Sequence, residues 1–421
     1  MYQTLITSLI AIFGTINIIR IGFFMIGADI YSIKEAARVK KQKRRGVRLP
    51  YFTVVIPAHN EEGIILHSLQ SVVNNNYPTN KLQIIVADDG STDKTADLVK
   101  EYKKLHPKIC LEILTQENAG KAHALNNAIR SLAIGELVMC LDADSSLHPD
   151  ALSEAAQYFY DKRVVAMAAN VKIRPTGTLF NLIQQYEYIV SYQVRRALTV
   201  FNIEYIIGGV GSVFRRRALL EVGLYDTNTI TEDIDLTMKL LQKGNKQWRV
   251  IFGAKVIAYT ESVLDLAGLI RQRCRWKFGR TQTFYKHRNL FFNSNKKHNR
   301  FLTLFYLPFS VYSDIAFFFE PLIVSYIVYL IIRYGDMITL LAPLCVVGGY
   351  ITLNVLVEHT IPLKQRFKLA AIAPTMYFFF YILSLAEYVA LIHGGVKAFT
   401  VKKSVDANVA NWQHVERPKI A

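Results

Sequence analysis

Long apolar runs lie near both ends of the chain, and a more polar segment separates them. The first extends from Leu5 to Ile26, about the length that crosses a hydrocarbon core of roughly 30 Å. Three more lie at about 313–332, 338–357 and 369–392, with Pro308, Pro321 and Pro374 predicting kinks or breaks. We predict an uncleaved N-terminal membrane helix and three further crossings. Because three crossings would place the mildly basic tail outside, we expect one segment to be re-entrant or interfacial.

The middle of the chain, from Tyr51 to about Ser262, alternates short β-type runs with helical patterns, which is typical of an α/β sheet. The expected strands are FTVVIP, LQIIVADD, CLEILTQ and LVMCLDAD. The apolar face of segment 180–201 fits either packing on this sheet or an interfacial membrane helix. Since ligands of open α/β sheets bind beyond the carboxyl ends of the strands, we expect the chemistry there.

Composition and charge assign different roles to these segments. The 421 residues are 51% hydrophobic yet carry a net charge of +17, a combination that one soluble globule poorly explains. Eight Lys or Arg lie between Lys34 and Arg48, directly after the first apolar run. The positive-inside rule places this flank in the cytoplasm and explains it better than a nucleic-acid-binding arm. Four cysteines without CxxC spacing argue against a zinc site or a disulfide framework.

Four acidic motifs follow one another on strand ends or in the loops after them: IPAHNEE, ADDGSTD, LDADS and ITEDIDL. Asp142 and Asp144 can converge only if their strand ends in a turn, where two hard oxygen ligands suit Mg²⁺ or Mn²⁺ carrying a diphosphate. A DxD motif alone is weak, because acidic turns are common. Asp233 stands near the start of a helix that should run through Lys243 and stop at Gly244, so it either complements the macrodipole or acts as a general base.

Three basic, glycine-rich or aromatic motifs add to these. In LIRQRCRWKFG, Gln272, Arg275 and Trp276 share one helix face, which suits a phosphate and a stacked sugar, or alternatively an interfacial helix. NAGKAHALN places Lys121 at a helix start, where an anion is favoured. IGGVGS, with Gly209 and Gly211, allows close backbone approach, although its spacing is not that of a P-loop.

The order DDGS, GK, DAD, GGVG, TED and QxxRW between membrane segments resembles the membrane-integrated, processive family 2 glycosyltransferases. These include synthases of cellulose, chitin, hyaluronan and poly-N-acetylglucosamine. The resemblance covers about residues 51–290, and CLDADS, ITEDI, QRCRW and the tail with Trp412 are most similar to the poly-β-1,6-N-acetylglucosamine synthases. It implies an α/β, Rossmann-like GT-A-type cytoplasmic domain flanked by transmembrane helices.

The resemblance also implies a role for each motif. At the donor, Asp89 would contact the uracil of a UDP-sugar, Glu61 and Lys121 would lie near the nucleotide, and Asp142 and Asp144 would hold the ribose and diphosphate through Mg²⁺ or Mn²⁺. Catalysis would fall to Asp233 as the base, with Glu232 beside it. Gln272, Arg275 and Trp276 would lie against the diphosphate and the acceptor, and Gly209 and Gly211 would border the acceptor.

The expected function is inverting, processive transfer of N-acetylglucosamine to a polysaccharide, coupled to its translocation across the plasma membrane. Alternatives are a hyaluronan- or chitin-type synthase, a non-processive transferase acting on a lipid acceptor, or a non-catalytic membrane scaffold. Expected partners are a UDP-sugar, a glycan or lipid acceptor, membrane lipids and a small membrane subunit, but no nucleic acid. The expected segments are a membrane helix at 1–28, a basic linker at 29–50, the catalytic domain at 51–262, a QxxRW region at 263–300, a membrane region at 301–395 and a tail at 396–421.

Overall fold

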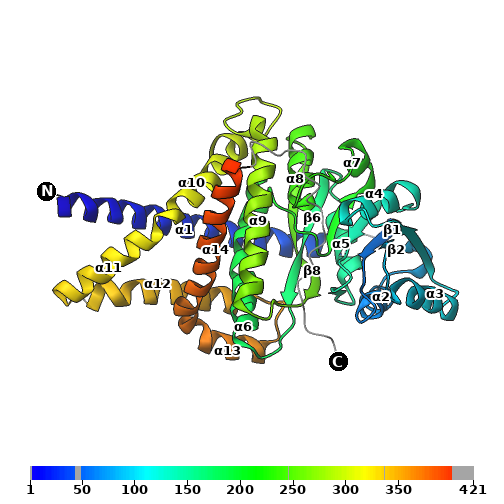
Figure 1. The fold of residues 1–421 in the computed structure, drawn as a ribbon, viewed down its shortest axis with the longest axis horizontal. Helices are drawn as coiled ribbons and strands as arrows, with labels where there is room; N and C mark the ends of the chain where they lie inside the picture. The colour runs from blue at the N-terminus through cyan, green and yellow to red at the C-terminus, as the bar shows by residue number, and fades with distance from the viewer. Residues whose placement is uncertain (1, 43–48, 245, 336, 401–421) are drawn as a thin grey trace.

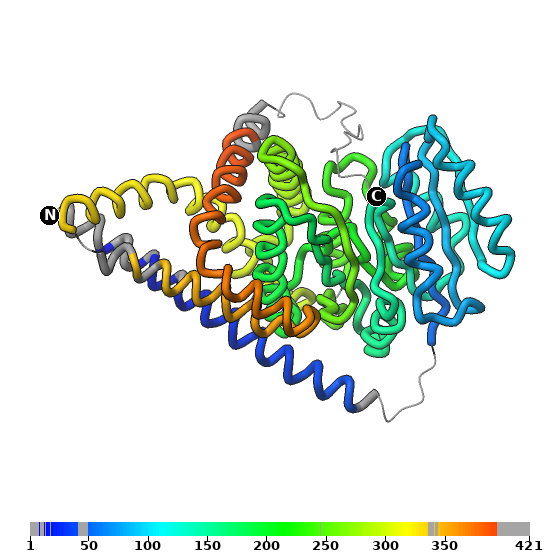
Figure 2. The backbone as a smooth tube through the Cα atoms, turned by 90° about the horizontal axis from the view of Figure 1, so that it is seen from below, coloured from blue at the N-terminus to red at the C-terminus, as the bar shows by residue number. Residues whose placement is uncertain are grey.

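The computed structural model describes residues 2–42, 49–244, 246–335 and 337–400. Within these ranges the strands form one mixed sheet, and helices cover it and extend beyond it. Figures 1 and 2 show strands β1 and β2 at one end of the long axis, and the N-terminal part of helix α1 together with α11 at the other. The sheet and the apolar helices therefore occupy opposite ends of the molecule.

The sheet has the strand order β3-β2-β1-β4-β7-β6-β8-β5. Strands β1 to β4 are mutually parallel, while β7 runs antiparallel between β4 and β6. The first three predicted strands are confirmed, and the fourth ends earlier than predicted, at Cys140. The strand bounds are β1 Phe52–Ala58, β2 Leu82–Asp89, β3 Cys110–Gln116, β4 Leu137–Cys140, β5 Ser146–Leu147, β6 Val164–Ile173, β7 Ser212–Arg215 and β8 Arg249–Thr260.

Amphipathic helices pack on this sheet. In α2 the buried residues Ile65, Leu69 and Val72 recur at helical spacing, so one face of the helix joins the core. Helix α8 begins at Glu232 and ends at Lys243 before Gly244, as predicted, with acidic residues in its first turn that complement the macrodipole. The helix bounds are α2 Ile65–Val73, α3 Thr95–Leu105, α4 Lys121–Ser131, α5 Ala151–Tyr158, α6 Leu179–Phe201, α7 Arg216–Glu221, α8 Glu232–Lys243 and α9 Leu266–Lys286.

Helix α6 joins the sheet to the apolar helices. It contacts β6 and β8 on the sheet, and it also contacts α1, α12 and α14. Its start is capped by Thr178, whose hydroxyl accepts a hydrogen bond from the Asn181 N–H. Gly27 of α1 lies so close to Ala197 that an added Cβ would overlap the alanine methyl group. Of the two interpretations left open by the sequence, packing on the sheet is confirmed.

Two helices in the described part of the chain are long and apolar enough to cross a membrane, at Gly14–Lys40 and Leu363–His393. A third candidate is bent by 49° between Phe318 and Glu320, as a broken span or a re-entrant loop. Pro321 lies just after this break, and Pro374 separates α13 from α14. Pro308 lies at the start of α10, directly after the π-helical turn Phe301–Tyr306, so each of the three predicted prolines stands at an interruption of the helices. The expectation of four crossings stays a prediction. The bounds are α1 Tyr2–Gln42, α10 Leu307–Phe318, α11 Glu320–Tyr334, α12 Met337–Leu356, α13 Leu363–Ile372 and α14 Met376–Thr400.

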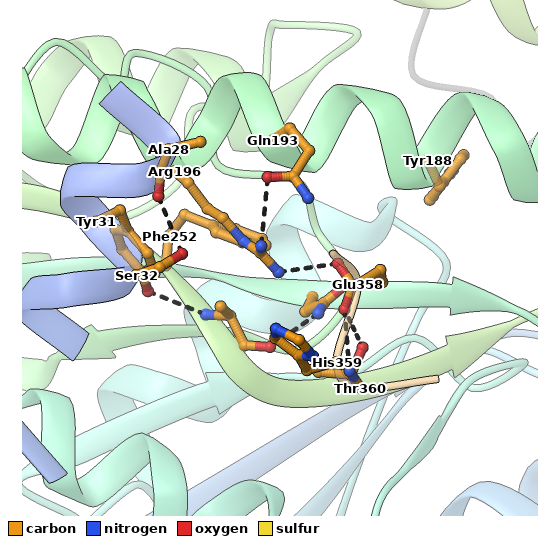
Figure 3. Close-up of polar contacts among 12 residues, drawn as sticks. Ala28, Tyr31, Ser32, Tyr188, Gln193, Arg196, Phe252, Glu358, His359 and Thr360 are labelled. Atoms are coloured by element: carbon orange, nitrogen blue, oxygen red, sulfur yellow. Dashed lines mark hydrogen bonds and ion pairs between the residues drawn. The ribbon is translucent and has the colours of Figure 1, made fainter. Parts of the chain in front are cut away.

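Buried polar contacts fasten these helices to the sheet (Figure 3). The Tyr31 hydroxyl of α1 donates to the Phe252 carbonyl of β8 at 2.8 Å. In the loop after α12, the Glu358 carboxylate is fully buried and accepts from Arg196 Nη2 of α6 at 2.8 Å. Lys172 Nζ of β6 lies 3.3 Å from its other oxygen. One carboxylate thus joins a strand, a helix and the loop between two apolar helices.

Replacing Glu358 should destabilise the protein strongly. In Glu358→Gln the Arg196 and Lys172 cations stay buried without their counter-charge, and breaking a buried pair in this way costs about 3–5 kcal/mol. We expect a clear drop in the thermal unfolding midpoint of the purified protein in detergent. Glu101→Gln, on the exposed face of α3, is the matched control and should change stability by less than about 0.5 kcal/mol. Equal midpoints for the two variants would contradict the prediction.

Candidate active site

The carboxyl ends of β1, β2 and β4 lie side by side because these strands are parallel neighbours. Each strand runs into one of the acidic motifs, so the topology brings together segments that are distant in sequence. The loop after β1 is tied to the one after β2, since the Asn60 N–H donates to Ser91 Oγ at 2.9 Å and the Glu61 N–H donates to Thr95 Oγ1 at 2.8 Å. Glu61 therefore lies in a loop at this edge of the sheet.

Asp89, the last residue of β2, organises the loop before α4. Its side chain is fully buried, and its carboxylate accepts hydrogen bonds from Gln116 Nε2, the Ala119 N–H and the Gly120 N–H at 2.7, 3.0 and 2.7 Å. Gly120 has a φ of 96°, a conformation that favours glycine, and α4 begins at the next residue. Asp89 thus determines where Lys121 stands. Its contact with a uracil ring stays a prediction.

Lys121 joins two of the predicted acidic motifs. Its Nζ lies 2.7 Å from Asp142 Oδ1 and 3.4 Å from Glu232 Oε1. Burial alone would lower the pKa of Lys121, but the carboxylates of Asp142 and Glu232 raise it above its usual range, so the ammonium stays charged. Gly209 of the GGVGS turn borders this group, because a Cβ there would lie 3.2 Å from Lys121 Nζ. Three of the predicted motifs therefore converge on one cation.

The DAD motif forms a turn directly after β4. The Ser145 N–H donates to the Asp142 carbonyl at 3.0 Å, and Ser145 Oγ donates to Asp144 Oδ1 at 2.9 Å. Asp142 and Asp144 are both half-buried. Strand β4 therefore ends in a turn, which is the condition under which the Asp142 and Asp144 carboxylates can converge.

A divalent cation held jointly by protein and substrate fits this turn. In the described ranges, no group of three or more His, Cys, Asp or Glu side chains forms a closed metal site. Mg²⁺ commonly takes one or two carboxylates and completes its coordination with substrate phosphates and water. The two half-buried carboxylates match that pattern, whereas a structural metal would need more protein ligands.

Asp233 combines a fixed position with an altered acidity. It lies in the first turn of α8, beside Glu232 and therefore next to the cluster of Lys121, Asp142 and Glu232. Burial, followed by the neighbouring Glu232 carboxylate, raises the pKa of Asp233 to about 6. A carboxylate with this pKa is a stronger base than an ordinary aspartate and is still mostly ionised at neutral pH.

Tyr225, Cys140 and Asn126 also support the site, and sequence reasoning missed them. The Tyr225 hydroxyl lies 3.0 Å from Cys140 Sγ in the strand that leads to Asp142. Asn126 of α4 clamps the Tyr225 backbone, accepting from its N–H and donating to its carbonyl, both at 2.9 Å. These contacts tie α4 to the segment that precedes α8. Asn126 stands in the NAGKAHALN motif, but nothing in its spacing indicates a partner 99 residues away.

Helix α9 carries the QxxRW residues on one face, as predicted. Arg275 is exposed, Trp276 is half-buried, and the Arg273 guanidinium lies 4.5 Å from the centre of the Trp276 ring system. One turn further, Gly279 packs so closely on Thr231 that an added Cβ would overlap its side chain. The QxxRW helix is therefore in direct contact with the TED segment, while contacts of Gln272, Arg275 and Trp276 with substrate stay predictions.

The same helix is ion-paired to the apolar helices. Lys277 Nζ lies 2.9 Å from Asp314 of α10 and 2.8 Å from Glu387 of α14. Arg273 Nη2 donates to Glu187 of α6 at 2.7 Å. Helix α9 is thus held between the TED segment and the apolar helices. These contacts on both sides differ from what is expected of a helix that lies freely on a membrane surface.

Comparisons with known proteins agree with this geometry. Residues 53–223 match the model of the family described as Glycosyl transferase family 2. The poly-beta-1,6-N-acetyl-D-glucosamine synthase of Staphylococcus aureus strain MSSA476 is 30% identical over 262 residues, 61% of this chain and 62% of that protein. The synthase of Staphylococcus epidermidis is 28% identical over 315 residues, 74% of this chain and 73% of that protein. The aligned region thus spans about three fifths of the Staphylococcus aureus relative.

A solved structure shares the fold. The mannosyltransferase PcManGT from Pyrobaculum calidifontis, in complex with GDP-Man and Mn²⁺, aligns with a TM-score of 0.55 and 21% identity. The alignment covers 90% of this chain and all of that one, so the mixed sheet with its flanking helices has the GT-A architecture. The fold is therefore that of the GT-A glycosyltransferases, and residues 53–223 are similar in sequence to glycosyl transferase family 2.

Proposed function

We propose that the protein is an inverting, processive glycosyltransferase that transfers N-acetylglucosamine from UDP-N-acetylglucosamine to a growing polysaccharide. The observation that carries the proposal is the convergence of Asp142, Glu232 and Lys121 at the strand ends, next to a carboxyl with a pKa of about 6. The names of the staphylococcal relatives support the donor sugar and the polymeric product. The close packing of the QxxRW helix on the TED segment supports a shared donor and acceptor site.

The proposed reaction needs one base and one source of positive charge. The acceptor hydroxyl attacks the anomeric carbon on the face opposite the UDP. A C–O bond forms to the acceptor while the bond to the diphosphate breaks, and Asp233 takes the hydroxyl proton. Lys121 stabilises the charge that develops on the leaving diphosphate. A second carboxylic acid is not required because UDP is already a good leaving group, unlike in glycoside hydrolysis.

Asp142 and Asp144 would hold a divalent cation, Mg²⁺ or Mn²⁺, at the donor diphosphate. When bound, such an ion neutralises phosphate charge as a Lewis acid. The ion pair of Lys121 with Asp142 restricts the orientation of one of these carboxylates. Lys121 and the divalent ion held by the two aspartates would together supply the positive charge opposite a nucleoside diphosphate.

We also propose that the catalytic domain lies on the cytoplasmic side of the plasma membrane and that the apolar helices conduct the product. The basic flank after the first apolar run supports this orientation through the positive-inside rule. The candidate spans and the bent pair α10–α11 support attachment to the membrane by more than one segment. The ion pairs of α9 with α10 and α14 place charged residues of the QxxRW helix against these segments.

The first test identifies the donor and the product. Purified protein in lipid should incorporate label from UDP-N-acetylglucosamine, rather than from UDP-glucose, UDP-glucuronic acid or GDP-mannose, into material that a β-1,6-N-acetylglucosamine hydrolase digests. Size fractionation of the product measures processivity. A product limited to one sugar on a lipid would contradict processive synthesis, and no incorporation from any of the donors would contradict the enzymatic function.

The second test concerns Asp233 as the base. Asp233→Asn should lower kcat by roughly 100- to 10,000-fold while leaving UDP affinity within about twofold, because the amide cannot take the acceptor proton. In the wild type, protonation of Asp233 removes the base, so kcat/KM should fall as the pH is lowered through about 6. Initial rates across pH and calorimetric UDP titrations measure both effects.

Asp97→Asn, on the exposed face of α3, is the matched control and should retain the wild-type rate and pH profile. If Asp233→Asn kept turnover, or if wild-type kcat/KM stayed flat between neutral pH and pH 5, Asp233 would not be the base.

The third test removes the metal. Dialysis against EDTA should lower the transfer rate by about 100-fold or more, since a bound divalent ion supplies several kcal/mol of charge stabilisation. Added Mg²⁺ or Mn²⁺ should restore the rate, and Asp144→Asn should raise the metal concentration needed for half-maximal activity. EDTA saturated beforehand with magnesium is the control. Full activity in metal-free buffer would disprove the metal role of the DAD turn.

A further inference from the structure

Asp235, two residues after Asp233, is a buried carboxylate that the proposed reaction does not use. It is fully buried, so it cannot touch a substrate in this arrangement. Its Oδ1 lies 2.9 Å from Nε2 of His287 and 2.8 Å from Nζ of Lys286, both at the C-terminal end of α9. A buried carboxylate is costly unless it is paired, so these contacts hold the two helices together at this point.

His287 contacts two residues of α8, Asp235 and Gln242. Its ring is 4% exposed, and besides Nε2 at Asp235 its Nδ1 lies 2.7 Å from Oε1 of Gln242. Asp235 and Gln242 are seven residues apart, which is about two helical turns and places them on the same face of α8. A ring held between two turns restricts both rotation and sliding of α9 against α8.

The face of α9 that makes these contacts continues the QxxRW face. Trp276, Gly279 and Lys286 recur at intervals that keep them on one stripe of the helix. Along this stripe Gly279 packs on Thr231, and Gln282 Oε1 accepts from the Ile230 N–H at 3.2 Å. From Trp276 to His287 the helix is about 16 Å long. The contacts at the C-terminal end of α9 therefore act together with those of Gly279 and Gln282 to set the orientation of this stripe over the TED segment.

We propose that Asp235 and His287 form a positioning pair that fixes α9 on α8, and thereby sets where Trp276 stands relative to Asp233. This inference rests on the proposed function. The pair acts through α9 and touches neither donor nor acceptor. Its loss should impair the chemical step and the use of the acceptor more than nucleotide binding, because Lys121, Asp142 and Glu232 stand at the start of α4, in the turn after β4 and at the first residue of α8, outside α9.

The decisive variants are His287→Ala and the conservative His287→Gln, whose amide keeps a donor within reach of Asp235. His287→Ala should lower kcat by about 10-fold or more, since a misplacement of about 1 Å costs up to 100-fold in rate, with UDP affinity within about twofold of wild type. His287→Gln should recover most of the rate. His106→Ala, at the end of α3, is the matched control and should behave as the wild type.

A readout independent of activity follows the position of Trp276. The chain has three tryptophans, so protein labelled with 5-fluorotryptophan should give a ¹⁹F NMR signal for each, and Trp276→Phe assigns the relevant one. That signal should shift in His287→Ala and return toward the wild-type position in His287→Gln. An unchanged Trp276 signal in His287→Ala overturns the proposal, and so does a rate within twofold of wild type or a parallel loss of UDP binding. If the wild type transfers no sugar, the proposed function fails, and the Trp276 signal alone then decides whether the pair positions α9.

Discussion

The ammonium group of Lys121 allows the acidic ends of separate elements to lie together. Asp142 follows β4 and Glu232 opens α8, and both face the same nitrogen at 2.7 and 3.4 Å. Without that cation the two carboxylates would repel each other; as a general scale, two like unit charges about 4 Å apart repel by about 4 kcal/mol at the effective dielectric of a protein surface. The arrangement of β4 against α8 therefore depends on one positive charge. Burial and the Glu232 carboxylate raise the pKa of the neighbouring Asp233, and Lys121 partly opposes that rise.

Lys121 is itself positioned by a series of backbone contacts that begins in the sheet. Asp89 ends β2, and its carboxylate binds the N–H groups of Ala119 and Gly120. These contacts start α4 at the right residue, and Asn126 in the same helix then holds the Tyr225 backbone ahead of α8. Asp89 of the ADDGSTD motif thus positions Lys121 of the NAGKAHALN motif. A substitution at Asp89 would act on the catalytic group through the loop, even if the side chain never met the nucleotide.

The sequence predicted the parts of this molecule that depend on local pattern. Residues 52–57, 82–89 and 110–116 form strands as expected, and α8 starts and stops where its acidic first turn and Gly244 indicated. The family resemblance implied that the GK, DAD and TED motifs lie together. In the structure the ion pairs of Lys121 with Asp142 and Glu232 join them. Contacts that depend on distant partners could not be predicted. The close packing of Gly279 on Thr231, the burial of Asp235 against His287 and the contacts of α6 with both the sheet and the apolar helices become visible only when segments tens of residues apart meet.

The buried Glu358 has a consequence for how the chain is made. Its partners Lys172 and Arg196 are synthesised more than 150 residues earlier, and their positive charges must wait for an anion that leaves the ribosome after α12. Until then the surface of β6 and α6 that will receive this loop carries two uncompensated charges and must stay hydrated. The sheet can therefore form first, but its contact with the loop after α12 is completed only after that loop has been synthesised. Completion of the fold is in this way linked to synthesis of the C-terminal half of the chain, and a chain terminated before Glu358 would lack the anion that closes this contact.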